Sequence, residues 1–219
     1  RFIPSVDGKI AITPSLNLDL TINPDFSQAE VDVQQTNLTR FELFFPERRQ
    51  FFIENSDLFE TFGFRQIRPF FSRRIGLSNG SPIPIIGGAR LSGKVNKNWR
   101  IGLMNIQTEG NNNQNIDAQN YTVAAFQRKI FTRSNIAGIL VNRQGFDNST
   151  MDYSNFNRVA GLDYNIASKD NKFRGKIFYH QSFQPNQPKR AAANASWLMY
   201  NNRNWFVMWN HEYVGENYQ

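Results

Sequence analysis

From Ile85 onward, the chain consists of segments in which apolar and polar side chains alternate, which is the period of a two-faced β-strand. The segments come in pairs, with a short turn inside each pair and a longer connection between pairs. The predicted strands are residues 85–94, 99–108, 120–130, 134–143, 156–167, 172–182, 192–201 and 204–213. Strands of soluble proteins are usually about 5–6 residues long. Longer segments in this order restrict the chain to a large antiparallel sheet in which sequential strands are neighbours.

The connections differ at the two ends of these predicted hairpins. The turn at residues 96–98 is short, whereas the connections at 109–119, 144–155 and 184–190 are long and polar. Short turns at one end and long loops at the other are typical of up-and-down barrels in outer membranes. We therefore predict an all-β fold, either an antiparallel up-and-down transmembrane β-barrel or the N-terminal part of a larger one. The alternative is a soluble β-sandwich with ordinary core aromatics.

The alternation separates each predicted strand into an apolar and a polar face. Leu162 and Tyr179 lie on the apolar faces of their strands, and Asp163, Arg174 and Lys176 lie on the polar faces. In a membrane barrel the apolar face contacts lipid and the polar face lines the lumen, with aromatic girdles at both interfaces. Basic lumen residues would bias the interior toward anionic ligands.

Two further strands are predicted near the start of the chain, within residues 1–36. Residues 16–22 and 28–34 alternate cleanly and are separated by an Asn-Pro-Asp turn. Asp25, Glu30 and Asp32 supply the oxygen ligands that a hard cation such as calcium prefers. Because the spacing of Glu30 and Asp32 equally suits ordinary polarity on a lumen-facing strand, we favour a polar lumen cluster and predict no metal site.

Alternation is lost over about residues 40–72, within a predicted insertion and loop at 37–84 that precedes the regular hairpins of 85–219. Residues 40–55 read RFELFFPERRQFFIEN, in which phenylalanines mix with charges and a proline. Buried charges need partners, so this insertion predicts an internal ion-pair network that fixes it against the sheet. The predicted network residues are Glu42, Glu47, Arg48, Arg49, Glu54, Arg73 and Arg74. The catalytic alternative uses Glu47 and Glu54 as general acid and base.

Composition excludes several classes of function. The chain has no cysteine, which rules out disulfides and thiolate metal sites, and its two histidines lack a second ligand at a recognisable spacing. The net charge is +7, but the basic residues are scattered, so we predict no nucleic-acid partner. We also expect no cofactor. Because the chain begins at Arg1 without a methionine, it is expected to be a processed or excised piece.

Several motifs together resemble a known family. They are NPDFSQAEVD at 23–32, NLTRFELFFPERRQFFIEN at 37–55, SRRIG at 72–76, GGARLSGK at 87–94 and GLD at 161–163. The chain resembles the uncharacterised outer-membrane β-barrel domain of Bacteroidota-type bacteria that follows a carbohydrate-binding module of the family-9-like kind. The resemblance spans nearly the whole chain as one domain. It implies a bacterial outer-membrane location, an association with surface glycans, and a barrel that continues through more strands.

The expected function is binding, passage or scaffolding at the cell envelope, without catalysis. The expected partners are outer-membrane lipid, a glycan or another anionic ligand, and other envelope proteins. The first alternative is a structural subunit of a multi-protein outer-membrane complex. The second is a hydrolase that uses Glu47 and Glu54.

Overall fold

The computed structural model describes residues 5–24, 47–64, 67–78, 81–110, 116–147, 150–186 and 189–219. Ten strands form the main sheet: β1 (Val6–Thr13), β2 (Leu16–Ile22), β5 (Ile85–Lys94), β6 (Trp99–Thr108), β7 (Ala118–Ile130), β8 (Ser134–Asp147), β9 (Thr150–Ala167), β10 (Phe173–Phe183), β11 (Ala192–Asn201) and β12 (Phe206–Val214). The insertion between β2 and β5 contains α1 (Gln50–Ile53), α2 (Asp57–Glu60), the 3-10 turn η1 (Ser72–Arg74) and the small hairpin β3 (Leu77–Ser78) and β4 (Ser81–Pro82).

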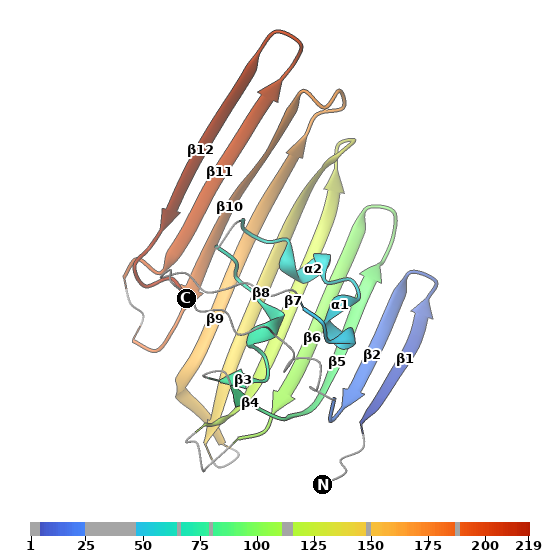
Figure 1. Cartoon of the computed structure of the whole chain (residues 1–219), viewed down its shortest axis with the longest axis vertical. Helices are drawn as coiled ribbons and strands as arrows, with labels where there is room; N and C mark the ends of the chain where they lie inside the picture. Colours follow the sequence, from blue (N-terminus) through green and yellow to red (C-terminus); the bar gives the residue numbers. More distant parts are fainter. Residues whose placement is uncertain are drawn as a thin grey trace.

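The main sheet is an antiparallel meander. Its strands follow the order β1-β2-β5-β6-β7-β8-β9-β10-β11-β12, so neighbours in space are neighbours in sequence apart from the insertion (Figure 1). The prediction of an all-β, antiparallel up-and-down fold is confirmed. The sheet is open, with β1 and β12 at its edges, so the closed transmembrane barrel stays a prediction.

The strand predictions agree closely with the structure after residue 84. β5, β6 and β11 begin and end at the predicted residues. The long connection predicted at 144–155 is wrong, because most of it extends the β8–β9 hairpin. A bulge between Gln144 and Phe146 lets the pairing continue to Asp147 and Thr150.

The first hairpin also differs from the prediction. Residues 6–13 form β1, which pairs with β2 on one side, while β5 pairs with β2 on the other. Both edges of β2 are therefore occupied, and one of its two neighbours is β1, which the sequence pattern did not predict. Residues 28–34 themselves lie outside the described residues.

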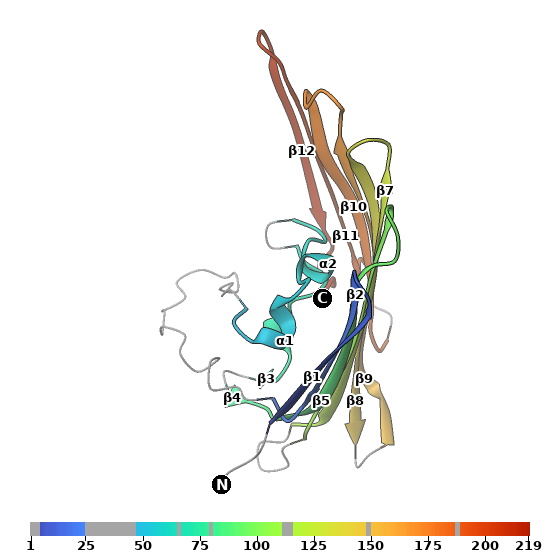
Figure 2. The ribbon, with the colours of Figure 1, turned by 90° about the vertical axis from the view of Figure 1, so that its right-hand side faces the viewer.

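The insertion covers one face of the sheet, which we call the inner face; the opposite side is the outer face (Figure 2). The predicted division of the strands is confirmed, since Asp163 and His180 are buried on the inner face at 1% and 0% exposure. Leu162 and Tyr179, one residue away from them, are 55% and 52% exposed on the outer face. The sheet therefore has a covered inner face, on which charged side chains are buried, and an apolar, exposed outer face.

An apolar core lies between the insertion and the middle of the inner face. The insertion contributes Phe52, Leu58, Phe59, Phe62, Phe70 and Ile75, and the sheet contributes Ile85, Met104, Ile106, Val123, Ala125, Ala137 and Ile139. Phe59 fits here because Gly102 of β6 has no side chain: a Cβ on Gly102 would lie 2.6 Å from the phenyl ring. Within the described residues, α1 and α2 have four residues each, and no helix is long and apolar enough to cross a membrane.

Candidate functional site

The inner face holds the insertion first through a buried cluster on β9 and β10. In the strand register Asp163 lies opposite Phe178, so Lys176 and His180 flank it diagonally on the same face. The Asp163 carboxylate accepts from Lys176 Nζ at 2.9 Å, through Oδ2, and contacts His180 Nε2 at 2.8 Å, through Oδ1. We call these three residues the β9–β10 cluster.

The β9–β10 cluster binds the main chain of the insertion. The N–H of Gly63 donates to Asp163 Oδ2 at 2.8 Å, and Lys176 Nζ donates to the carbonyl oxygens of Gly63, at 2.6 Å, and Thr61. Gly63 has a φ of +68°, and a Cβ there would lie 1.9 Å from the carbonyl oxygen of Ile67. Only glycine fits this close approach of the two backbone segments. The backbone conformation at Gly63 is therefore what places its N–H and carbonyl oxygen against the Asp163–Lys176 pair.

Tyr218 extends the β9–β10 cluster on the side of His180. Burial raises the pKa of the Tyr218 phenol, and the charge of Asp163 raises it further, so the phenol remains protonated. The Tyr218 hydroxyl lies 3.4 Å from His180 Nδ1. With the phenol donating to Nδ1, His180 carries its proton on Nε2 and donates it to Asp163.

A second buried ion pair holds the insertion to β2 and β5. Arg90 is 2% exposed, and its Nη2 lies 2.8 Å from Asp19 Oδ2. The same guanidinium donates to the carbonyl oxygen of Phe51 in α1 and lies over the Phe51 ring, 5.2 Å from its centroid. Glu54 adds a weaker contact, with its Oε2 3.9 Å from Arg90 Nη2. Arg90 is therefore the cation that binds α1 to the sheet.

Glu54 has its main partner on the first strand. Lys9 Nζ donates to Glu54 Oε1 at 2.5 Å and to Oε2 at 2.7 Å. This hydrogen bond from Lys9 lowers the pKa of Glu54, and the charges of Lys9 and Arg90 lower it further, against the smaller effect of burial. Glu54 is thus held as a carboxylate, which suits an anchoring role better than that of a general acid.

The third network lies inside the insertion. Arg49 Nη2 lies 2.7 Å from Glu47 Oε2, and Arg49 also donates to the carbonyl oxygens of Ser72 and Ile75. Burial alone would raise the pKa of Glu47, but hydrogen bonds from Arg49 and Ser72 and the charge of Arg49 outweigh it, and the pKa is lowered. Arg49 therefore connects the start of the insertion to η1 and the residue after it.

Ser72 links Glu47 to a second carboxyl group. Its hydroxyl lies 2.7 Å from Glu47 Oε2 and 3.0 Å from Glu60 Oε1. Burial raises the pKa of Glu60, and the charge of Glu47 raises it further, against the lowering effect of the Ser72 hydrogen bond and Arg68. A serine hydroxyl has a single proton to donate. When Ser72 donates to Glu47, a protonated Glu60 can donate to Ser72 in turn.

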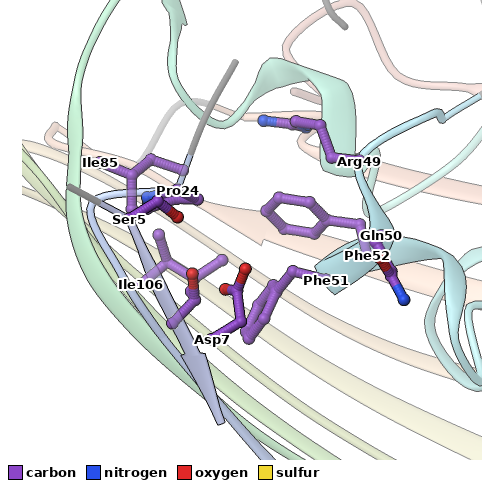
Figure 3. Close-up of a pocket in the computed structure, with 10 residues that line it drawn as sticks. Ser5, Asp7, Pro24, Arg49, Gln50, Phe51, Phe52, Ile85 and Ile106 are labelled. Carbon is purple, nitrogen blue, oxygen red and sulfur yellow. The ribbon is translucent and has the colours of Figure 1, made fainter. Parts of the chain in front are cut away.

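A cavity of about 180 Å³ lies between α1 and the first strands of the sheet. Figure 3 shows Asp7 and Ile106 on the sheet side of this cavity, and Arg49, Phe51 and Phe52 on the side of the insertion. Thr21 also lines the cavity. Its side chain is 3% exposed, and its Oγ1 has no hydrogen-bond partner in the described part of the chain. An unpaired buried hydroxyl at a cavity of this size is a place where a water molecule or a small hydroxylated ligand binds.

The structure brings together part of the predicted network. Glu47, Arg49 and Glu54 have the contacts described above, and Arg73 is buried at 7% exposure. Arg48 and Arg74 are exposed. The remaining predicted site residues, Glu42, Asp25, Glu30 and Asp32, lie outside the described residues.

Glu47 and Glu54 do not share a site. Glu47 contacts Arg49 and Ser72, whereas Glu54 contacts Lys9 and Asn17, and each carboxylate is held by a cation. The pairing of acid and base that the hydrolase alternative needs is not formed by these two residues. Among the described residues, no group of three or more His, Cys, Asp or Glu side chains is placed to hold a metal ion.

The sequence prediction missed the residues that anchor the insertion to the sheet. Asp163 and Lys176 were placed on polar strand faces, but their mutual contact and their contact with Gly63 were not predicted. Arg90 and Asp19 were missed entirely. The available signal was a charged residue in the middle of an otherwise apolar strand, since such a charge needs a partner from another element.

The fold and these contacts define a class of protein. It is an all-β protein whose open antiparallel sheet carries a short, partly helical insertion on its inner face. The chain belongs to the family described as a domain of unknown function, DUF5916, whose model matches residues 4–219. The resemblance to an uncharacterised family is thereby confirmed, and its Bacteroidota, outer-membrane and carbohydrate-binding context stays a prediction. No curated protein and no solved structure matches the chain.

Proposed function

We propose that this chain forms part of the wall of a bacterial outer-membrane β-barrel, in which the insertion is a plug held on the lumen side, and that it acts in binding or gated passage at the cell envelope. The observation that carries this proposal is the polarity of the sheet. Arg90, Asp163 and His180 are buried on the inner face, while Leu140 and Leu162 are 61% and 55% exposed on the outer face.

This polarity is unfavourable for a sheet in water and favourable for one in lipid. Fully burying a leucine or isoleucine side chain contributes about 1.5–3 kcal/mol, and the outer face leaves many such side chains uncovered. The exposed outer-face residues include Ile10, Leu20, Leu103, Leu140, Leu162, Ile177 and Tyr179. A contiguous apolar surface of this extent on a soluble protein is a site of association. An outward apolar face backed by a polar inner face matches a transmembrane barrel wall.

Aromatic side chains at the short-turn end of the sheet support the same orientation. Trp99 and Phe126 pack on the outer face with ring centroids 5.9 Å apart, and the Arg128 guanidinium lies 5.2 Å from the Trp99 centroid. Tryptophan beside a cation is typical of the membrane–water interface, where the ring contacts acyl chains and the charge contacts water and head groups.

The anchoring of the insertion supports a gated or binding role over a permanently open pore. Two buried ion pairs, Asp163–Lys176 and Asp19–Arg90, hold it to the sheet from opposite sides of the apolar core. Passage through a barrel with this plug requires the insertion to leave at least one of these pairs. An association with surface glycans rests on the resemblance of the sequence alone.

The test uses two tryptophans that the sheet places on opposite faces of neighbouring strands. Trp209 lies on the outer face of β12 and is 60% exposed, whereas Trp197 lies on the inner face of β11, where it pairs with Asn210. Variants that each retain one of these tryptophans are reconstituted with brominated phospholipid. We expect the fluorescence of Trp209 to be quenched and that of Trp197 to be largely unaffected.

Equal quenching of both tryptophans, or a chain that stays monodisperse in buffer without detergent, would contradict the proposal. A channel role is tested separately by conductance in planar bilayers. A closed barrel that does not conduct leaves the binding role and removes passage.

A second candidate is a structural subunit of a multi-protein outer-membrane complex. The observation that favours it is the exposure of both edge strands, since every residue of β1 and of β12 is exposed. Unpaired strand edges pair readily with another strand and are not stable in contact with lipid. Stoichiometric partners that co-purify in detergent would favour this candidate over a free-standing barrel.

A further inference from the structure

Five basic side chains line a cavity of about 340 Å³ at the short-turn end of the sheet. They are Lys94, Lys97, Arg100, Lys129 and Arg133, and no carboxylate of the described chain lines the cavity with them. The remaining lining side chains are amides and a hydroxyl, which can donate hydrogen bonds. We call this cavity the basic pocket.

The strand register brings the cations of the basic pocket together. Lys94 of β5 lies directly opposite Arg100 of β6. The backbone N–H of Lys129 donates to the carbonyl oxygen of Asn98 at 2.8 Å, so the β5–β6 turn lies beside the end of β7. Like charges directly opposite each other on neighbouring strands destabilise a sheet. The grouping therefore costs stability unless an anion offsets it.

Among the residues that the structure describes, a carboxylate offsets the charge of only one member of the basic pocket. Arg100 forms a two-pronged pair with Asp57 of α2, with Nη1–Oδ2 at 2.6 Å and Nη2–Oδ1 at 3.0 Å. Lys94, Lys97 and Lys129 are exposed and form no ion pair with any described residue. Arg133 hydrogen-bonds the side chain of Asn171, which is neutral.

Lys176 differs from the lysines of the basic pocket because its charge is paired within the protein. The sequence predicts that it biases the lumen toward anions, but its charge is neutralised by Asp163 and covered by the insertion. Lys176 is therefore not available to a ligand, whereas Lys94, Lys97 and Lys129 of the basic pocket are exposed.

We propose that the basic pocket binds a phosphomonoester group. Such a group carries about −1.5 to −2 charges at neutral pH and three strong acceptor oxygens. That charge suits several lysines, which act as compact point charges, and the acceptor oxygens suit the amide donors of the pocket. A carboxylate carries a single charge, which offsets less of the charge of Lys94, Lys97 and Lys129 than a phosphomonoester does.

The phosphomonoester has two possible sources, a lipid head group and a soluble phosphorylated compound. Lys94 and Arg100 share the inner face with Arg90, and Arg100 contacts Asp57 of the insertion, so in the proposed barrel the basic pocket opens toward the lumen. This favours a soluble phosphorylated compound as the source. The choice of source rests on the proposed membrane location, whereas the phosphomonoester site itself does not.

The experiment titrates the full chain in detergent with glycerol 3-phosphate, a soluble phosphomonoester, and, separately, with short-chain phosphatidic acid, measuring affinity by calorimetry. Short-chain phosphatidylcholine, which has no phosphomonoester, is the comparison ligand. Replacing Lys94 and Lys129 by Gln (K94Q/K129Q) is expected to weaken binding by roughly tenfold or more, since two charge-assisted contacts are lost. Both side chains are exposed, so the fold should be unchanged by circular dichroism.

The matched control replaces Lys169 and Arg203 by Gln (K169Q/R203Q), which removes the same net charge from exposed positions outside the basic pocket. Binding of this control should stay within roughly twofold of the parent chain. Equal weakening of both double variants, or no binding of either phosphorylated probe, overturns the proposal. Binding of phosphatidic acid alone supports a lipid source, and binding of glycerol 3-phosphate alone supports a soluble one. Either result stands whether or not the chain is a membrane protein.

Discussion

Replacing Lys176 by Met (K176M) should release the insertion from the sheet. The substitution keeps most of the length of the side chain and removes its charge, the ion pair to Asp163 at 2.9 Å and the hydrogen bonds to the carbonyl oxygens of Thr61 and Gly63. Asp163 is then left buried at 1% exposure with the neutral donors that remain. Removing one partner of a buried ion pair costs about 3–5 kcal/mol, and we expect the free energy of unfolding to fall by that amount.

The matched control is the same substitution at Lys172 (K172M), just before β10. Lys172 pairs with Asp170 at 3.2 Å, and both side chains are 53% exposed. Solvent screens this pair, so K172M should leave stability unchanged within error. The free energies are measured by guanidinium unfolding in detergent or lipid. Equal stabilities of K176M and K172M would refute the assignment of the β9–β10 cluster as an anchor.

A second readout separates release of the insertion from general weakening of the sheet. Because the chain has no cysteine, replacing Phe62 by Cys introduces a unique thiol at a position that is 3% exposed. Labelling of this thiol under native conditions should be slow alone or with K172M, and faster with K176M. If K176M lowers stability without speeding the labelling, the insertion stays in place and the reasoning about its release is wrong.

Three further predictions concern other parts of the site. Replacing Arg90 by Met leaves Asp19 buried and unpaired, so the free energy of unfolding should fall by about 3–5 kcal/mol in chemical denaturation. If it falls by no more than it does for a surface substitution, the role given to this pair is wrong. Replacing Gly102 by Val should cost about 1–3 kcal/mol by overpacking. The control is the same substitution at Gly8, where nothing lies within 4 Å of an added Cβ, and it should not lower the free energy of unfolding. Finally, the raised pKa of Glu60 means that the folded state binds its proton more tightly, so the contribution of Glu60 to the free energy of unfolding falls as pH rises above about 4.5 toward the folded pKa. Replacing Glu60 by Gln should remove this loss, and its advantage over the parent should grow from pH 4 to pH 7.

The strand pattern was predictable because it is local. Residues 85–94 and 99–108 are two segments of strand length separated by turn residues, so local sequence alone marks their boundaries. The extension of β8 and β9 was missed because Asp152 and Ser154 read as loop by composition, although β9 continues through them and pairs with β8 on both sides of them. Tertiary pairing overrides local propensity at such positions.

The contacts of the insertion were not predictable from the sequence. Gly63 and Asp163 lie 100 residues apart, and they meet because the meander and the insertion are folded together. The Glu47 and Arg49 contact was accessible, since those residues are near neighbours in a segment where charges require partners. The contact of Arg90 with Asp19 requires the pairing of β2 with β5, which skips the insertion.

The two ion pairs that hold the insertion also have a mechanical consequence. One lies on β2 and β5 and the other on β9 and β10, and β6, β7 and β8 lie between them in the sheet. The insertion therefore contacts the sheet on both sides of β6, β7 and β8. It constrains the spacing between two strand pairs that do not touch each other. A load applied to the insertion is carried to both ends of this span. Loss of either pair frees the curvature of the intervening strands, so a movement of the insertion and a change in the shape of the sheet are one motion.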